Sequence, residues 1–303
     1  MRIGINGTGL VQKANTQTII EHARQAHADG FGSYWLAEHP TGGFDALTVL
    51  ALVGQAVSGL ALGSAIIPTM PRHPMVLAGQ ARTVDQALGG RLTLGVGLSH
   101  EVMMADLGIE FTRPIRHLKD YLDVLLPLLQ AGSVDAKGET ISARAQFFGT
   151  SERATPVLVA ALGPQALKVT GRLADGTILA WVGPKTIAEH IAPTIRAAAD
   201  AAARPAPQIV ASLPVCVTRD ADAVREKIGR GLRMYGQLPS YRAMFEREGV
   251  AGPADVAIVG DAAQVRDGIA RMRDAGVTVF SPTEFFTSPE EAQETRTLLK
   301  SLL

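Results

Sequence analysis

The chain has 303 residues, of which 47% are hydrophobic and 19% charged, enough for a substantial core in one barrel or in two smaller domains. Its 29 basic and 29 acidic residues balance, so its charge points to neither a nucleic acid nor an anionic membrane as a partner. Because no uncharged run approaches a membrane span, and MRIGING at the start resembles a strand rather than a signal peptide, we expect a soluble, cytoplasmic protein.

Short apolar segments alternate with longer amphipathic segments along most of the chain, which predicts strands that alternate with helices. The predicted strands cover 2–6, 33–37, 60–67, 91–96, 156–161, 177–181, 208–217 and 277–281. The predicted helices cover 16–29, 45–57, 74–88, 114–130, 165–174, 185–203, 263–275 and 289–303.

Three stretches interrupt this alternation. Residues 98–112 read as a loop with some helical character. Residues 133–150 are polar and poor in strand-forming residues, so we expect an excursion without strands. Residues 220–249 are helical but interrupted at Gly236 and Pro239, which indicates an extra helix.

Eight predicted strands, nearly all followed by a helix, favour a parallel sheet covered by helices. The count and the length fit a (β/α)8 barrel, or TIM barrel, with insertions. A doubly wound sheet is the alternative. A dinucleotide-binding motif is disfavoured, because the series Gly7, Gly9, Gln12 lacks the third glycine and the helix begins only near Thr16.

His39 and His100 are the candidate catalytic residues among the seven histidines, because each follows a predicted strand at its carboxyl end. The alternative for both is a loop histidine that hydrogen-bonds to the backbone. His22, His27 and His190 fall within predicted helices as surface or packing residues, and His117 is expected to be exposed. No two histidines are spaced for one helix face, so we predict no metal site.

The single cysteine, Cys216, lies in the apolar run PVCV and excludes an intramolecular disulfide and a cysteine-rich metal site. We expect a buried, unreactive thiol there. No Gly-x-Ser-x-Gly elbow and no paired carboxylates stand out, so hydrolase chemistry is disfavoured.

Small residues at the ends of predicted strands offer room for a flat ligand. Gly63, Ser64 and Ala65 leave space where a planar ring could press on the backbone, although a tapering barrel would also need small side chains. The run GVGLSH, which contains Gly97, lacks the Lys-Ser/Thr of a nucleotide triphosphate site. Gly163 opens a turn into a helix start that could bind phosphate, a feature common to many barrels.

Four segments in order resemble the bacterial luciferase-like superfamily, and within it the coenzyme F420-dependent oxidoreductases. The strand ending SYWLAEH is similar to the family's Trp-x-x-Asp/Glu-His signature. Residues 64–97 resemble the run from strand three to strand four, and residues 158–181 resemble the unit from strand five to strand six. Residues 260–280 resemble the last helix and strand, so the resemblance covers nearly the whole chain.

The resemblance implies one luciferase-like barrel domain over 1–303, with a lid near 231–253. It implies coenzyme F420, a 5-deazaflavin, as cofactor, with FMN as the alternative. A non-proline cis peptide bond at Ser64–Ala65 would back the cofactor ring, and the amides of Gly163 and Gln165 would meet its phosphate, since Pro164 has no N–H. The cofactor-binding residues implied are Ser64, Ala65, Gly97, Gly163, Gln165 and Trp181.

His39 matches the family's strand-two histidine, which would orient or protonate a small organic substrate during hydride transfer. Two departures argue against sugar-phosphate oxidation. An aromatic residue expected soon after this histidine is replaced by the run Pro40-Thr41-Gly42-Gly43. The acidic residue expected after strand four is replaced by His100, with Glu101 beside it. An enone, an imine or an alcohol remains open as substrate.

Three functions are therefore compatible with the sequence. The first is an F420-dependent oxidoreductase, and the second is an FMN-dependent luciferase-like monooxygenase on the same barrel. The third is a barrel that binds a cofactor or a partner without turnover. The resemblance also implies a homodimer that acts on a small molecule. The balanced charge and the lack of a long uncharged run predict no nucleic-acid or membrane partner.

Overall fold

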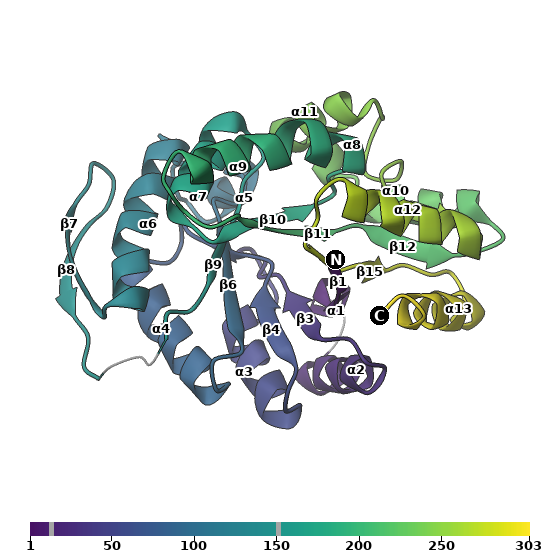
Figure 1. The fold of residues 1–303 in the computed structure, drawn as a ribbon, viewed down its shortest axis with the longest axis horizontal. Coiled ribbons are helices and arrows are strands. Elements are labelled where there is room, and N and C mark those ends of the chain that lie inside the picture. Colours follow the sequence, from purple (N-terminus) through teal and green to yellow (C-terminus); the bar gives the residue numbers. More distant parts are fainter. Residues whose placement is uncertain (12–14, 150–152) are drawn as a thin grey trace.

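A ring of parallel strands forms the centre of the protein in the computed structural model, which describes residues 1–11, 15–149 and 153–303 (Figure 1). The hydrogen-bonded order is β1-β14-β11-β10-β9-β6-β4-β3-β2. Because β1 and β2 are consecutive pieces of one segment, their pairing with β14 and β3 closes the ring. The strands of the ring are β1 (Arg2–Ile3), β2 (Ile5–Asn6), β3 (Ser33–Leu36), β4 (Ala61–Ser64), β6 (Leu92–Gly97), β9 (Val157–Ala160), β10 (Gly176–Ala180), β11 (Gln208–Ser212) and β14 (Val279–Phe280).

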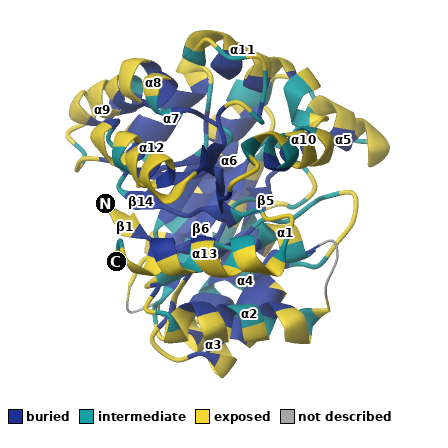
Figure 2. Ribbon diagram, turned by 90° about the vertical axis from the view of Figure 1, so that its right-hand side faces the viewer, coloured by how far each residue is buried: buried dark blue, intermediate teal, exposed yellow. Residues whose placement is uncertain are grey.

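The (β/α)8 barrel with insertions is thereby confirmed. Helices surround the ring, and their inner faces are dark blue in Figure 2 while their outer faces are yellow. These helices are α2 (Thr16–Ala28), α3 (Ala46–Ala56), α4 (Pro74–Ala87), α6 (Pro114–Gln130), α7 (Pro164–Leu173), α8 (Pro184–Thr186), α9 (Ala192–Asp200), α12 (Ala262–Asp274) and α13 (Pro289–Lys300).

Local sequence sets where several helices begin. Asp45 caps α3 by accepting a hydrogen bond from the Thr48 amide. Asp261 and Ser288 begin α12 and α13 with capping boxes, in which side chain and backbone satisfy each other. The predicted helix 185–203 forms as α8 and α9 joined by a π-helical turn, Ile187–Ile191.

The excursion expected at 133–150 is present in its described part, but it is not poor in strands. Residues Ser133–Lys137 (β7) and Ser142–Gln146 (β8) pair as an antiparallel hairpin beside α6. Only Val134 and Ala143 of this hairpin are buried, so the strands carry little of the apolar signal on which the prediction relied. Residue 150 lies outside the described part of the chain.

The predicted strand 208–217 divides between two sheets. Its first part is β11 of the ring, whereas β12 (Pro214–Val217) joins β13 (Ile258–Gly260) and β15 (Thr283–Glu284) in a small parallel sheet. The strand β13 was not predicted, since three apolar residues carry almost no pattern. A short strand, β5 (Ile67–Pro68), pairs with β6.

Further short elements lie at the carboxyl ends of the strands, where the loops are longest. They are α1 (Thr8–Val11), α5 (Glu101–Asp106), α10 (Ala221–Gly231), a 3-10 turn (Tyr235–Gln237) and α11 (Pro239–Glu248). The 3-10 turn and α11 fall within the segment expected to be a lid. Among the described residues, no helix combines the length and the apolarity needed to cross a bilayer.

Candidate active site

Trp35 fills the centre of the barrel beneath its mouth. Its ring packs in a separate apolar cluster inside the ring of strands, with Leu158, Ile178, Val210 and Val279. Gly63 on the neighbouring strand leaves room for this ring, because a Cβ added there would come within 2.2 Å of it. The Trp35 Nε1 donates a hydrogen bond to Ser33 Oγ, at 3.1 Å, which fixes the orientation of the indole.

Above Trp35 the next inward positions of five adjacent strands carry only small residues. Alternate side chains of a strand face the same side of the sheet. The residue two positions after each member of the interior cluster therefore also points its side chain into the barrel. At Gly97 an added Cβ would lie 3.0 Å from the Ala160 Cβ and 3.2 Å from Ile66 side-chain atoms. The residues in these positions are Ala37, Ala65, Gly97, Ala160 and Ala180. These five residues form an apolar floor of small side chains, and the Ile66 side chain lies against it at Gly97.

A non-proline cis peptide bond lies beside this floor, one residue later than expected. It joins Ala65 and Ile66, so its assignment to Ser64–Ala65 is wrong by one position. The Ile66 carbonyl accepts a hydrogen bond from the Glu38 amide at 3.0 Å. Ser64 is fully buried, and its hydroxyl is bonded to both the carbonyl and the amide of Gly95, at 2.9 and 2.8 Å. Its hydroxyl thus ties β4 to β6 and leaves the backbone as the part able to meet a ligand.

Glu38 is tied to the end of strand three by Arg72, a residue that the sequence did not single out. Arg72 Nη2 lies 3.1 Å from Glu38 Oε1 and 2.9 Å from Asp45 Oδ2. The Ala46 amide donates to Glu38 Oε2 at 3.1 Å, which engages the second oxygen. Arg72 Nη1 is buried and has no hydrogen-bond partner among the described residues. One guanidinium thus links the loops that follow β3 and β5.

Burial acts on both carboxyl groups of this cluster, with different net results. Burial raises the pKa of Glu38, and the nearby Arg72 charge and the Ala46 hydrogen bond oppose it only in part. Burial also acts to raise the pKa of Asp45, but hydrogen bonds from Thr48 and the charge of Arg72 lower it below its usual value. Asp45 therefore stays ionised to lower pH than Glu38 does.

His39 follows Glu38 directly, at the carboxyl end of β3. The ring is half-buried, and burial lowers its pKa below 6.5. Its carbonyl accepts a hydrogen bond from the Gly42 amide at 3.2 Å, which turns the chain after the histidine. At neutral pH the imidazole is therefore uncharged and can either give or take a proton.

His100 lies at the end of the strand-four loop, against aromatic residues of the expected lid. Its ring centroid is 5.6 Å from that of Tyr241 and 6.3 Å from that of Tyr235. Tyr235 also meets Trp181 edge to face at 5.8 Å. Burial lowers the pKa of His100, so this histidine too is neutral at pH 7. The 3-10 turn and α11 thus close over the loops that follow β6 and β10.

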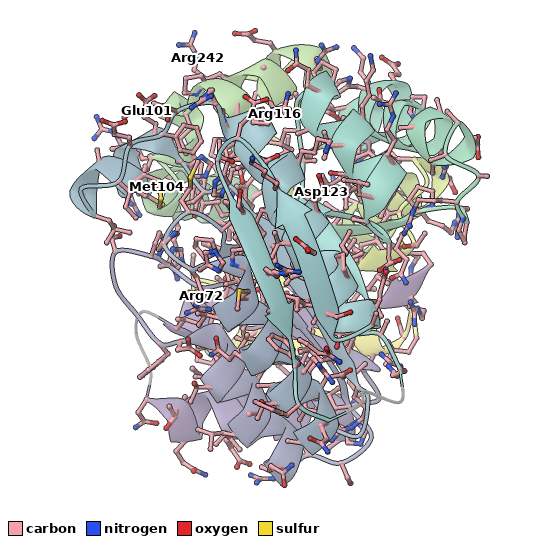
Figure 3. The ribbon with its side chains drawn as sticks, turned by 90° about the vertical axis from the view of Figure 1, so that its left-hand side faces the viewer. Arg72, Glu101, Met104, Arg116, Asp123 and Arg242 are labelled. Atoms are coloured by element: carbon pink, nitrogen blue, oxygen red, sulfur yellow. The ribbon has the colours of Figure 1, made fainter. Side chains whose placement is uncertain are left out.

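Figure 3 shows the outer side of this region. Arg242 of α11 lies toward the top, Glu101 and Met104 of α5 lie below it, and Arg72 lies lower still. Glu101 is exposed and begins α5. Of the two neighbours at that loop, His100 is the one that meets the lid.

Two residues at the mouth adopt a left-handed backbone that residues with a side chain rarely take. Ser99 has φ 64° and follows β6, and Trp181 has φ 58° and follows β10. Such conformations cluster at functional sites, where the surrounding structure enforces them. The Trp181 amide donates to the Ser212 carbonyl at 3.1 Å, which holds the turn to the next strand.

The start of α7 lies at the same end of the barrel. Gly163 is the N-cap residue, and Gly163, Pro164 and Gln165 are all exposed. The preceding Leu162 carbonyl is bonded to His190 Nε2 at 2.8 Å, which fixes the turn to the π-helical segment. The amides of Gly163 and Gln165 are accordingly open to an anionic group.

The expectation that His117 is exposed is wrong. Its ring is 9% exposed, packs 5.6 Å from the ring of Tyr121, and lies with Nε2 3.3 Å from Thr69 Oγ1. Its position on the buried face of α6 explains this, since Leu118 and Leu122 share that side. Within residues 1–11, 15–149 and 153–303, no cluster of three or more histidine, cysteine or acidic side chains could hold a metal ion.

Comparison with known proteins gives one family and several relatives. The profile of the luciferase-like monooxygenase family matches residues 3–279. The 5,10-methylenetetrahydromethanopterin reductase of Methanolobus tindarius is 23% identical, over 69% of this chain and 64% of its own length. The F420-dependent glucose-6-phosphate dehydrogenase of Mycolicibacterium fortuitum is 29% identical, over 67% of this chain and 65% of its own. The chain thus spans less than two thirds of the length of these curated relatives.

Solved structures share the fold along the whole chain. An F420-dependent secondary alcohol dehydrogenase, in complex with an F420–acetone adduct, superposes with a TM-score of 0.82 at 19% identity and covers 100% of this chain and 98% of that one. The oxygenating constituent of 3,6-diketocamphane monooxygenase from Pseudomonas putida, in complex with FMN, gives 0.78 at 14% identity, over 99% and 96%. At such identities the likeness shows the fold alone.

Proposed function

The chain belongs to the luciferase-like monooxygenase family, and from this premise we propose that it is an oxidoreductase that uses coenzyme F420 and a small organic substrate. The observation that carries the proposal is the apolar floor of small residues beside a neutral, half-buried histidine. Gly97 and Ala160 add little bulk to this floor, the Ile66 side chain lies against Gly97, and His39 stands at the adjoining mouth. Curated relatives with F420-dependent activities support the deazaflavin over other cofactors.

The residues present fit such a cofactor. The ring would rest on the floor formed by Ala65, Gly97 and Ala160, and the backbone from Ser64 to Ile66 would back it. A phosphate of the cofactor would meet the amides of Gly163 and Gln165 at the start of α7. Trp181 would flank the ring from the end of β10. When bound, a 5-deazaflavin supplies a hydride donor or acceptor.

His39 would handle the proton that accompanies hydride transfer. Reduction of a carbonyl consumes one proton and oxidation of an alcohol releases one, so a group that changes protonation near pH 7 is needed. A neutral imidazole performs both roles through Nδ1 or Nε2. Arg72 would hold Glu38, and through it the backbone of His39, in one position. His100 and the lid tyrosines would exclude water from the mouth.

An FMN-dependent monooxygenase is the second candidate. The observation that favours it is the same floor, because a flavin and a deazaflavin present equally flat rings. The camphane monooxygenase, which has the same fold, binds FMN, and this supports FMN as an alternative cofactor. The two candidates differ in one measurable property, since only the flavin enzyme would consume oxygen together with reduced cofactor.

Titration of the purified protein with F420 and, separately, with FMN tests the proposal by fluorescence quenching. We expect F420 to bind tightly and FMN to bind weakly or not at all. Gly97→Ala should weaken F420 binding about fivefold or more, since its Cβ would displace the Ile66 and Ala160 side chains that border the floor. The same change at Gly79, where a Cβ meets nothing within 4 Å, should not weaken binding.

Tight FMN binding with oxygen consumption would replace the first candidate by the second. Failure of both cofactors to bind would overturn both. Binding of F420 without reduction or oxidation of any ketone, imine, enone or alcohol would leave a non-catalytic cofactor-binding barrel.

A further inference from the structure

Four uncharged polar side chains, three of them buried, gather at the carboxyl end of the barrel strands, and we call them the polar arc. They are Asn6 of β2, Ser212 of β11, Ser281 just after β14, and Thr283 of β15. Asn6 Nδ2 donates to Ser212 Oγ at 3.2 Å, and Ser212 Oγ lies 3.2 Å from Thr283 Oγ1. Ser281 is the fourth member. Asn6 is thus brought to a residue more than 200 positions away in the sequence.

Strand alternation places the polar arc inside the barrel. Val210 and Val279 belong to the interior cluster and pair with each other across β11 and β14. Ser212 and Ser281 stand two residues further along, so they share the inward face at the next level up. The Ser281 amide donates to the Ala211 carbonyl at 2.9 Å, which extends the same pairing to this level.

The Ser281 hydroxyl makes no hydrogen bond to the described residues. The residue is 1% exposed, and its Oγ is buried without a hydrogen-bond partner among the described residues. A buried hydroxyl without a partner is costly, and native structures usually satisfy it with protein, water or a ligand. The neighbouring members of the arc bond to one another and leave Ser281 Oγ free to donate or accept.

The polar arc lies across the barrel from the floor of small residues. Around the ring, β14 is four positions from β6, which carries Gly97, so the two stand on opposite sides. If the cofactor rests on the side of β4, β6 and β9, as the proposed function requires, the polar arc faces it from the substrate side.

We propose that the polar arc is a substrate subsite that binds an uncharged hydroxyl or carbonyl group, an inference that rests on the proposed function. Hydroxyl and amide side chains carry no charge at any physiological pH, so they recognise neutral donors and acceptors. A carboxylate or phosphate would lose its hydration without gaining a counter-charge from these four residues. Glu284, the next charged residue after Thr283, is paired with Arg296 on α13.

The probes are cyclohexanone, cyclohexanol and cyclohexanecarboxylate, which share a ring and differ in charge. Their binding to F420-loaded protein is measured by the change in cofactor absorbance and by saturation-transfer NMR. We expect the two neutral probes to bind about tenfold or more tightly than the carboxylate. Ser281→Ala should weaken binding of the neutral probes about fivefold while the dissociation constant of F420 changes less than about twofold.

Ser281→Ala should fold normally, because its hydroxyl makes no internal hydrogen bond that the change would remove. Ser58→Ala, at an exposed position, is the matched control and should leave all three affinities unchanged. Equal or tighter binding of the carboxylate, or no effect of Ser281→Ala, overturns the subsite. A parallel loss of F420 affinity in Ser281→Ala also overturns it, since the hydroxyl would then serve the cofactor.

The same titrations on cofactor-free protein separate this inference from the proposed function. If neither F420 nor FMN binds, the proposed function fails by itself. The subsite then stands only if the neutral probes still bind in a manner that depends on Ser281, and it is overturned if they do not.

Discussion

Arg72 Nη2 lies 3.1 Å from Glu38 Oε1, and this ion pair joins the loops at the ends of the second and third strands of the barrel. Both side chains are mostly buried, with 20% and 13% of their surface exposed. The Arg72 backbone is itself fixed, because the Tyr121 hydroxyl donates to its carbonyl at 2.8 Å. The backbone of His39 is thus held by a chain of contacts that begins on α6.

Arg72→Gln should destabilise the protein by about 1–3 kcal/mol, because it leaves two partly buried carboxylates without their shared cation. Urea unfolding measures the loss. Arg230→Gln is the matched control, since the Arg230–Glu226 pair is mostly exposed and should be worth about 0–1 kcal/mol. Equal losses in the two variants would contradict a special role for Arg72.

His39→Ala should lower turnover by on the order of 100-fold while the affinity for F420 changes little, because the proton-transfer group is lost but the floor is kept. Steady-state rates and the fluorescence titration give the two numbers. His27→Ala, at an exposed position of α2, should alter neither. Unchanged turnover, or a loss that lies wholly in cofactor binding, would remove His39 from the chemistry.

The two half-buried histidines, His39 and His100, should titrate below 6.5. Burial lowers the pKa of His39 and of His100 from 6.5, so between the folded and the unfolded values the unfolded chain binds more protons. Each histidine therefore costs stability as the pH falls below about 6.5 and costs none above it. NMR titration of the imidazole protons checks the midpoints, with His39→Gln and His100→Gln for assignment. Midpoints above 6.5 would show that these rings are solvated.

The raised pKa of Glu38 has the opposite effect on stability. As the pH falls, the folded protein binds a proton at Glu38 at a higher pH than the unfolded chain does, so this group favours the folded state. The stability of His39→Gln minus that of the wild type, measured across pH 5 to 8, isolates the histidine contribution. We expect this difference to grow in favour of the variant as the pH falls.

Tyr235→Ala should open the mouth. The Tyr235 ring contacts both His100 and Trp181, so its loss admits water to both. The pKa of His100 should then rise toward 6.5, since burial is what lowers it. Trp181 emission should shift to longer wavelength, while Trp35, which is 5% exposed, should not change. Tyr235→Phe keeps the ring and should leave both readouts as in the wild type.

The positions of His39 and His100 at strand ends could be predicted from the sequence, but the residues that surround them could not. His39 and His100 were recognisable because each ends an apolar strand, and in a parallel barrel those ends meet at one face. Arg72 gave no such signal, since a lone arginine in a Pro-rich loop is ordinary until its partners at positions 38 and 45 are brought to it. The lid tyrosines were similarly hidden, because aromatic contacts with His100 span more than 100 residues of sequence.

The alternation of strands and helices could be predicted from local sequence, because buried strands and the buried face of each helix give regular patterns of apolar residues. The small residues where strands three and four end could be read from the sequence as well. What those ends face became evident only in the folded protein. Closure of the ring through β1 and β14 brings Asn6 to Ser212 and leaves the Ser281 hydroxyl buried without a partner. Such pairings depend on register between distant strands, and no local pattern encodes register.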